Sequence, residues 1–271
     1  MFKRKVSIIQ IKKDKKKEIF DQVLVEKSIN ILINSQPLVN IICLPKDIKQ
    51  LAIGFLYSIG VIDNIRDIKT IKIDESKVNI QLKSSRTLKN ISNYLKKNPI
   101  SRIIDTSCGI SSSWRDIIKQ KLNNDKEKNT SSDKDIQINQ ENIFLALKEM
   151  QINTTLFRET GGCHGASIFN IEDKKMLIIM EDIGRHNAID KAIGELIINN
   201  IPLNNVLLTT TGRLTGDVVL KAIRAKIPIV ASISAPIESG IRLAFAYGIT
   251  LIGFVRGSRM NIYTHPKRII L

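Results

Sequence analysis

The spacing of apolar residues changes character near residue 175. From there to the end of the chain, short apolar runs alternate with amphipathic segments that repeat about every 3.6 residues. The pattern predicts strands at 176–181, 205–211, 227–234 and 249–255, and helices at 186–198, 215–226 and 238–248. Strands that alternate with helices are typical of an α/β domain with a largely parallel sheet.

The first half of the chain carries fewer and more varied elements. Apolar runs predict strands at 36–45 and 78–82, and helical periodicity predicts helices at 47–60, 85–99 and 139–150. Asp47 and Asn139 are expected to cap their helices, because short polar side chains accept hydrogen bonds from free N–H groups. Gly60 suits the end of the first helix. This half is therefore predicted to be a smaller α+β portion.

One segment lacks apolar side chains altogether. Residues 123–135, NNDKEKNTSSDKD, cannot contribute to a core and are expected to connect two parts exposed to solvent. The predicted organisation is an N-terminal portion at 1–122, a linker at 123–135, and an α/β domain at 136–271 with anion-binding strand ends.

Composition limits the functional classes. The net charge of +16 would suit nucleic acid, but aromatic residues make up only 5% and the eight Lys and Arg of residues 3–17 read as a solvated arm or edge strand. Three cysteines cannot form a disulfide framework, which suits a reducing compartment. No apolar run reaches about 18 residues, the length of a membrane span. We expect a soluble cytoplasmic protein that binds neither nucleic acid nor membrane.

Polar, glycine-rich turns follow the predicted strands of the α/β domain. Arginine accompanies glycine, serine or threonine in these turns at Arg185, Arg213, Arg256 and Arg259. Open α/β sheets bind ligands at the carboxyl ends of their strands, where helix N-termini favour anions, and the guanidinium fork grips phosphate oxygens in pairs. Any α/β protein needs such turns, but several together favour a nucleotide-like anion. Neither a phosphate-loop nor a Rossmann glycine motif is present.

Other residues are candidates for chemistry. Cys108 lies in the small polar loop DTSCGISSS, where a thiol would be accessible. His164 and His186 suit either acid–base work or a structural, orienting role. Adjacent Glu181 and Asp182 would point to opposite sides of a strand, so we interpret them as one cap and one ligand contact. The chain has no C-x-x-C pair, which leaves too few ligands for a catalytic zinc ion.

Several motifs together resemble the FdhD family, the formate dehydrogenase accessory sulfurtransferases. They occur in the family's order and spacing: LAIGFLYSIGVI, the Cys108 loop, TGGCHGA, EDIGRHNAIDKAIG, TTTGR, IPIVASISAP and GITLIGFVRGSRMNIYTH. The resemblance spans roughly residues 35–265, and its most specific block is Glu181–Gly194.

The resemblance implies a cytoplasmic sulfur carrier that is an enzyme, a sulfurtransferase. It implies that Cys108 takes sulfur as a persulfide from a cysteine desulfurase. The sulfur then passes to the molybdenum bis(molybdopterin guanine dinucleotide) cofactor, a bound substrate that formate dehydrogenase later uses. It also implies a cytidine-deaminase-like three-layer fold without a zinc site, a homodimer, and a cofactor-binding segment that matches Phe254, Val255, Arg256, Gly257, Ser258 and Arg259.

The chain departs from the family pattern at several positions. Ser111 replaces the second cysteine of the family's C-G-x-C loop, which puts in doubt any step that needs a second thiol. Thr215 and Asp217 stand where Ser and Glu are usual, and Ile237 replaces a Thr. Cys163, between Gly162 and His164, is a rival thiol that an imidazole could activate. Cys43 is expected to be a buried packing residue.

Other functions stay open on these residues. The first alternative is a chaperone that binds the molybdenum cofactor without moving sulfur, which would share the arginine-rich edge and differ at Cys108. The second is a nucleotide hydrolase that uses His186 or Glu181 as a base. For sulfur transfer, a lowered pKa at Cys108 caused by Arg102 or Arg115 would help, because the thiolate is the nucleophile.

Overall fold

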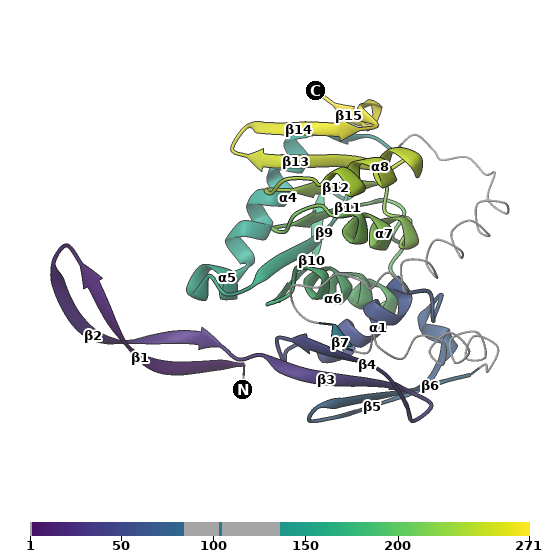
Figure 1. Cartoon of the computed structure of the whole chain (residues 1–271). Coiled ribbons are helices and arrows are strands. Elements are labelled where there is room, and N and C mark those ends of the chain that lie inside the picture. Colours follow the sequence, from purple (N-terminus) through teal and green to yellow (C-terminus); the bar gives the residue numbers. More distant parts are fainter. Residues whose placement is uncertain (1, 84–102, 105–135) are drawn as a thin grey trace.

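A computed structural model describes residues 2–83, 103–104 and 136–271. Its larger sheet has six strands in the order β10-β9-β11-β12-β13-β14. The bounds are β9 His164–Asn170, β10 Lys175–Asp182, β11 Val206–Thr210, β12 Ile229–Ser232, β13 Thr250–Arg256 and β14 Arg259–Thr264. Figure 1 shows these strands side by side through the upper part of the molecule.

The prediction of a largely parallel sheet is wrong. Only the β11–β12 and β12–β13 pairs are parallel, whereas β10–β9, β9–β11 and β13–β14 are antiparallel. The reason is that short turns join β9 to β10 and β13 to β14, and a short turn can join only antiparallel neighbours. β10, β11, β12 and β13 nevertheless run in one direction, so their carboxyl ends share one edge of the sheet.

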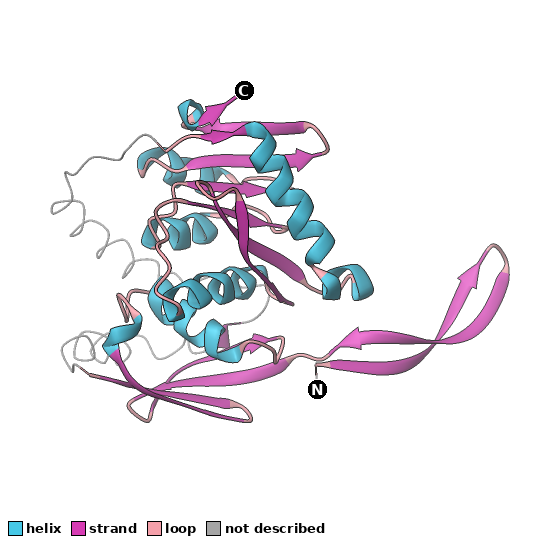
Figure 2. Ribbon diagram, turned by 180° about the vertical axis from the view of Figure 1, so that it is seen from behind, coloured by secondary structure: helices cyan, strands magenta, loops and turns pink. Residues whose placement is uncertain are grey.

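Helices cover both faces of this sheet. α4 (Gln140–Asn153) packs on one face, and α6 (Arg185–Ile198), α7 (Gly216–Arg224) and α8 (Glu238–Ala246) pack on the other. Successive residues show the division, because Leu207 belongs to the α4 side of the core and Leu208 to the opposite side. Figure 2 shows α4 in front of the sheet. The mixed α/β class is confirmed, and the closer likeness to cytidine deaminases stays a prediction.

A second sheet lies in the N-terminal portion. Its strands have the order β5-β6-β3-β4-β7, with bounds β3 Lys27–Ile33, β4 Gln36–Cys43, β5 Ile68–Asp74, β6 Lys77–Leu82 and β7 Ile103–Ile104. β7 runs parallel to β4 and pairs Ile104 with Ile41. β4 therefore connects the rest of this sheet to the last described residues before the Cys108 loop.

α1 (Ile48–Ser58) joins the two portions. It lies between the second sheet and α6 in Figure 1, and a single cluster of buried apolar residues takes in β3, β4, α1, α6 and the larger sheet. The short elements η1 Ile65–Asp67, β8 Ile138–Asn139, α5 Thr155–Thr160, η2 Pro266–Arg268 and β15 Ile269–Ile270 complete the described fold. The domain division at 122 and 136 stays a prediction.

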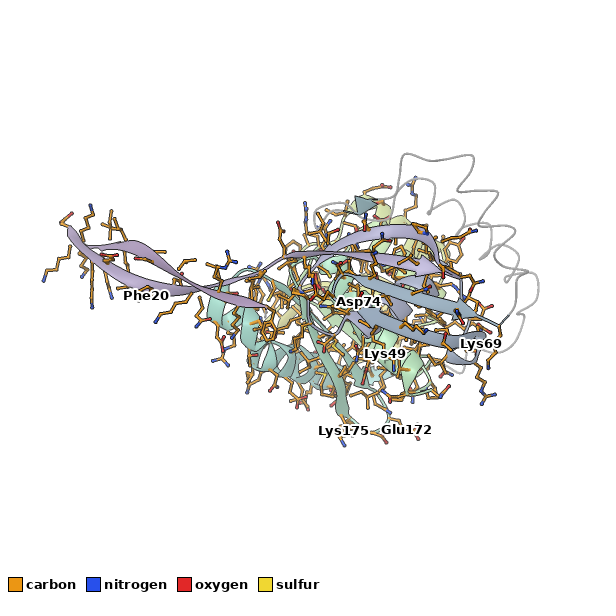
Figure 3. The ribbon with its side chains drawn as sticks, turned by 90° about the horizontal axis from the view of Figure 1, so that it is seen from below. Phe20, Lys49, Lys69, Asp74, Glu172 and Lys175 are labelled. Carbon is orange, nitrogen blue, oxygen red and sulfur yellow. The ribbon has the colours of Figure 1, made fainter. Side chains whose placement is uncertain are left out.

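β1 (Lys3–Lys12) and β2 (Lys15–Leu24) form an antiparallel ribbon that projects from the body, as Figures 1 and 3 show. Ion pairing of Lys3 with Glu159 of α5 holds its base. Ile9, Ile11 and Phe20 are exposed along it. The predicted basic arm is thus confirmed, and it is a two-stranded ribbon rather than the edge of a sheet.

The helix ends test the predicted caps. Asn139 accepts a hydrogen bond from the Glu141 N–H at 2.8 Å, and Gly60 adopts φ +78° just after α1, so both predictions are confirmed. Asp47 precedes α1, but its side chain makes no cap hydrogen bond, because its backbone is left-handed instead of extended. The predicted helix at 85–99, the linker and Cys108 lie outside the described residues. No helix in the described part is long and apolar enough to span a membrane.

Candidate anion-binding site

All six strands of the larger sheet begin or end at one of its edges. The carboxyl ends of β10, β11, β12 and β13 meet there, and the antiparallel β9 begins there, with His164 opposite Asp182 of β10. The turns after β10 and β11 bring Arg185 and Arg213 to this edge. We refer to His164, Arg185, Thr211 and Arg213 as the strand-end site.

His164 is held at the start of β9 by Thr211. Its Nδ1 lies 3.1 Å from the Thr211 hydroxyl oxygen, which also accepts a hydrogen bond from the Gly165 N–H at 3.1 Å. Burial lowers the pKa of His164, and the positive charges of Arg185 and Arg213 lower it further. The lowered pKa favours the neutral imidazole near pH 7, and an anion beside the two arginines would raise that pKa again.

Arg185 is partly buried, and its backbone end is held closely by the fold. It begins α6, and the backbone of Gly212 presses against it so tightly that a Cβ at Gly212 would lie 2.8 Å from the Arg185 Cβ. The Arg185 Nε is buried and has no hydrogen-bond partner among the described residues. Burial and the charge of Arg213 lower the pKa of Arg185. Two neighbouring guanidinium groups with an unfilled donor form a place where an anion is strongly favoured.

The turn after β11 is fixed in place by hydroxyl groups. Thr210 Oγ1 accepts a hydrogen bond from the Gly212 N–H at 3.1 Å, and Ser232 of β12 donates to the Gly212 carbonyl oxygen at 2.7 Å. Thr215 is the residue just before α7. Its hydroxyl makes no cap hydrogen bond and is buried with no partner in the described part of the chain. Asp217 follows in the first turn of α7, and its negative charge offsets part of the lowering of the Arg185 pKa. Thr215 and Asp217, which are expected to depart from the family pattern, therefore lie close to Arg213 and Arg185.

Residues 254–259 lie farther along the same edge. They end β13 and turn into β14, with Gly257 at φ +57° and the Phe254 N–H donating to the Ser234 carbonyl at 3.0 Å. Arg256, Ser258 and Arg259 are exposed, whereas Val255 is buried on the α4 side of the core. β13 is two strands from β11, a separation of about 10 Å. The predicted cofactor segment and the strand-end site are thus neighbours on one surface.

Comparison with known proteins identifies the family. The model of the FdhD/NarQ family matches residues 24–270. The chain belongs to the FdhD/NarQ family. It is 35% identical to the sulfur carrier protein FdhD of Bacillus subtilis strain 168 over 93% of this chain and 92% of that one. It is 34% identical to the sulfur carrier protein FdhD of Saccharolobus solfataricus over 98% of each chain.

A solved structure resembles this FdhD/NarQ family member over its full length. It is a crystal structure from Desulfotalea psychrophila, described as a formate dehydrogenase accessory protein. The TM-score is 0.77, the sequence identity is 25%, and the match covers 100% of both chains. The arrangement of sheets and helices above is therefore one that this family adopts.

Two of the three cysteines of this family member are buried. Cys43 is fully buried, and burial raises its pKa to about 12. Burial and the Glu181 carboxylate, 3.6 Å from the Cys163 Sγ, together raise the pKa of Cys163 to about 12. The prediction that Cys43 is a packing residue is confirmed. The charged group nearest to the Cys163 thiol is thus the Glu181 carboxylate, which disfavours the thiolate. The activation by a neighbouring imidazole that the sequence suggested would instead have favoured it.

Glu181 and Asp182 have the roles of a cap and a buried ion-pair partner. Glu181 accepts hydrogen bonds from the backbone N–H groups of Leu156 and Phe157 at the start of α5, so the predicted cap is confirmed. Asp182 is fully buried and lies 2.6 Å from the Nζ of Lys191. The prediction of a ligand contact at Asp182 is wrong, because Lys191 and backbone N–H groups occupy its carboxylate.

Sequence reasoning missed Lys191, and it left His186 open. Lys191 is fully buried in α6, and the sequence offered only a weak sign of it, a lysine directly before the apolar pair Ala192 and Ile193. His186 is only 5% exposed in the first turn of α6, which favours an orienting role over contact with a ligand. Among the described residues, no group of three or more His, Cys, Asp or Glu side chains could hold a metal ion.

Proposed function

We propose that this chain is a sulfur carrier of the FdhD type. It takes sulfur from a cysteine desulfurase as a persulfide and passes it to the molybdenum bis(molybdopterin guanine dinucleotide) cofactor for use by formate dehydrogenase. The names of its relatives support the general role. The observation that carries the cofactor side of the proposal is the pair of guanidinium groups at Arg185 and Arg213, with the Arg185 Nε unsatisfied.

The cofactor in this proposal is a substrate, and the residues at the sheet edge fit its chemistry. Arg185, Arg213 and the Thr215 hydroxyl offer donors to a phosphate, and neutral His164 offers a further polar contact. Arg256 and Arg259 extend the same surface toward the β13–β14 turn. A guanine dinucleotide carries pyrophosphates separated by organic rings, so two separate groups of arginine along one edge of the sheet suit it.

Cys108 is the proposed sulfur-carrying residue. Its thiolate would attack the outer sulfur of the desulfurase persulfide; a new S–S bond forms at Cys108, the old S–S bond breaks, and the donor cysteine leaves as a thiolate. Cys43 and Cys163 are poor candidates for this step, because each has a pKa of about 12 and is buried. The chain reaches Cys108 after Ile104, which pairs with Ile41 of β4 two residues before Cys43. A lowered pKa at Cys108 caused by Arg102 or Arg115 belongs to this proposal.

Sulfur transfer can be tested by tracing an isotope from labelled cysteine to the protein. The protein is incubated with a cysteine desulfurase and cysteine labelled with sulfur-34, and peptide mass spectrometry finds the thiol that gains a sulfur. We expect label on Cys108, loss of label in Cys108→Ser, and retention in the matched variants Cys43→Ser and Cys163→Ser. Label on Cys163 that survives Cys108→Ser would refute the assignment.

A second function, a cofactor chaperone without sulfur transfer, is favoured by Ser111. The family loop commonly has a cysteine there, and this chain lacks the second thiol. In that case Cys108 would gain no label while guanosine diphosphate binds normally. Restoration of labelling by Ser111→Cys would show that the second thiol is what the loop lacks.

A cytoplasmic homodimer completes the proposal. Sedimentation equilibrium at several concentrations tests the assembly, and a mass near 30.5 kDa throughout would contradict it. Fractionation of cells tests the compartment.

A further inference from the structure

We propose that Asp182, Asn187 and Lys191 form a positioning network, called here the β4 clasp, that holds Arg185 in place for an anion. The three residues do not contact the ligand. They join the carboxyl end of β4 to the Gly184–Arg185 turn at the start of α6. The inference rests on the proposed function only in so far as Arg185 binds a phosphate.

Asp182 is the centre of the β4 clasp. Its Oδ1 accepts hydrogen bonds from the Gly184 N–H at 2.9 Å and the Asn187 side-chain amide at 3.0 Å. Its Oδ2 accepts one from the Leu44 N–H at 3.1 Å and lies 2.6 Å from Lys191 Nζ. Both oxygens are therefore fully engaged, one with the turn that precedes Arg185 and the other with the end of β4.

Lys191 completes the contacts from α6. Its Nζ donates to the Leu44 and Glu181 carbonyl oxygens, each at 3.2 Å, and contacts the Asp182 carboxylate. These three partners use all three donors of the ammonium group. Buried ion pairs seldom stabilise a fold more than well-packed apolar residues do. Because all three N–H donors of Lys191 bind groups at the ends of β4 and β10, we interpret the pair as one that positions these strand ends.

Asn187 fixes the turn itself. Its amide donates to the Ile42 carbonyl at 2.9 Å as well as to Asp182. Gly184 lies so near that a Cβ there would come within 2.9 Å of the Asn187 amide nitrogen. The turn is thus held from the β4 side by the clasp, while Gly212 presses on Arg185 from the β11 side. Arg185 has little freedom between them.

A second buried ion pair offers a matched control. Asp190, also in α6, lies 2.6 Å from Lys221 Nζ of α7, with side chains 2% and 1% exposed. Its other described hydrogen bond comes from the Ser58 hydroxyl of α1 at 2.7 Å. These hydrogen bonds reach neither the Gly184–Arg185 turn nor β4, although burial and, beyond it, the nearby charge of Asp182 raise the pKa of Asp190. The two pairs match in residue types, distance and burial, and each has one member in α6, but they differ in what they position.

The experiment compares full-length Lys191→Met with Lys221→Met. Affinity for guanosine diphosphate is measured by calorimetry, and thermal midpoints are measured on the same samples. We expect both variants to lose thermal stability and only Lys191→Met to lose about tenfold or more in affinity. Combined with Arg185→Gln, Lys191→Met should add no further loss, because the clasp acts through Arg185.

The contrary results are distinct. Wild-type affinity in Lys191→Met, an equal loss in Lys221→Met, or full additivity with Arg185→Gln would each overturn the clasp. If Lys191→Met fails to fold, Asn187→Ala keeps the ion pair and removes the link to Ile42, and it should show the same selective loss. If wild-type protein does not bind guanosine diphosphate, the proposed function fails instead. The clasp is then judged by amide hydrogen exchange at residues 184–186, which Lys191→Met should accelerate and Lys221→Met should not.

Discussion

Gly54 of α1 and Gly194 of α6 lie at the point where the two helix backbones touch. A Cβ built on Gly54 would lie 1.8 Å from the Asp190 carbonyl oxygen, and one on Gly194 would lie 2.0 Å from the Gln50 carbonyl oxygen. No side chain larger than hydrogen fits at either position. This contact brings α1 and the second sheet close enough to α6 for β4 to reach Asp182.

Replacement of Gly194 by alanine should therefore destabilise the protein despite the better helix propensity of alanine. Alanine gains up to about 1 kcal/mol over glycine in a helix, but here the helices must separate. Overpacking of this kind costs about 3 kcal/mol, and urea unfolding measures the change. Gly162→Ala is the control, because its nearest contact would be an ordinary 3.4 Å. Equal stabilities for the two variants would contradict the close approach.

Arg185→Gln and Arg213→Gln should each weaken the binding of guanosine diphosphate. A hydrogen bond to a charged group contributes about 1.5–3 kcal/mol, which corresponds to roughly a tenfold to hundredfold loss in affinity. The loss should be larger for Arg185, whose Nε is buried, than for exposed Arg213. Arg242→Gln, an exposed α8 residue paired with Glu238, is the control. Calorimetry at fixed salt measures all three, and a larger effect at Arg242 would exclude the site.

His164 should make the folded state less stable in mild acid. Its pKa is lowered by burial and by Arg185 and Arg213, so the unfolded chain binds a proton at a higher pH than the folded chain does. Stability is then lost as the pH falls below about 6.5, the ordinary histidine pKa, toward the lowered folded value. In His164→Gln this part of the pH dependence should disappear. Chemical unfolding between pH 5 and 8 measures it.

An anion at the strand-end site should reverse this effect. A bound phosphate offsets the two arginines and raises the pKa of His164, so binding near pH 6 should take up a proton. Calorimetry in buffers of different ionisation enthalpy detects the uptake. Unchanged uptake in His164→Gln would assign the proton to another group.

Cys43 and Cys163 should resist alkylation in the native protein. With a pKa of about 12 for each, about one thiol in ten thousand is ionised at pH 8, and burial slows the reagent further. Iodoacetamide followed by peptide mass spectrometry should leave both unmodified until urea is added. In Glu181→Gln, Cys163 should react faster than in the wild type while Cys43 does not, because the nearest negative charge is gone.

Local patterns predicted much of this fold and the place of its site. The alternation after residue 175 predicted the helices and most strands of the larger sheet, and glycine–arginine turns predicted that Arg185 and Arg213 would meet at one edge. Pairing was not predictable in the same way. β9 enters between β10 and β11 as an antiparallel strand, and nothing in its own apolar run says which neighbours it takes, since both kinds of pairing bury the same side chains.

The sequence by itself determined where the chain is helical or extended, which residues seek burial, and the family to which the motifs point. Those properties depend on neighbours a few positions away, through periodicity, caps and turns. Only the tertiary structure decided that Asp182 serves Lys191 rather than a ligand, that Cys163 faces Glu181, and that Gly54 meets Gly194. The partners in these contacts are at least 9 residues apart in sequence. Whether a charged group or a thiol can react or bind a ligand depends on which distant atoms surround it and remove its water. A local sequence pattern does not contain that information.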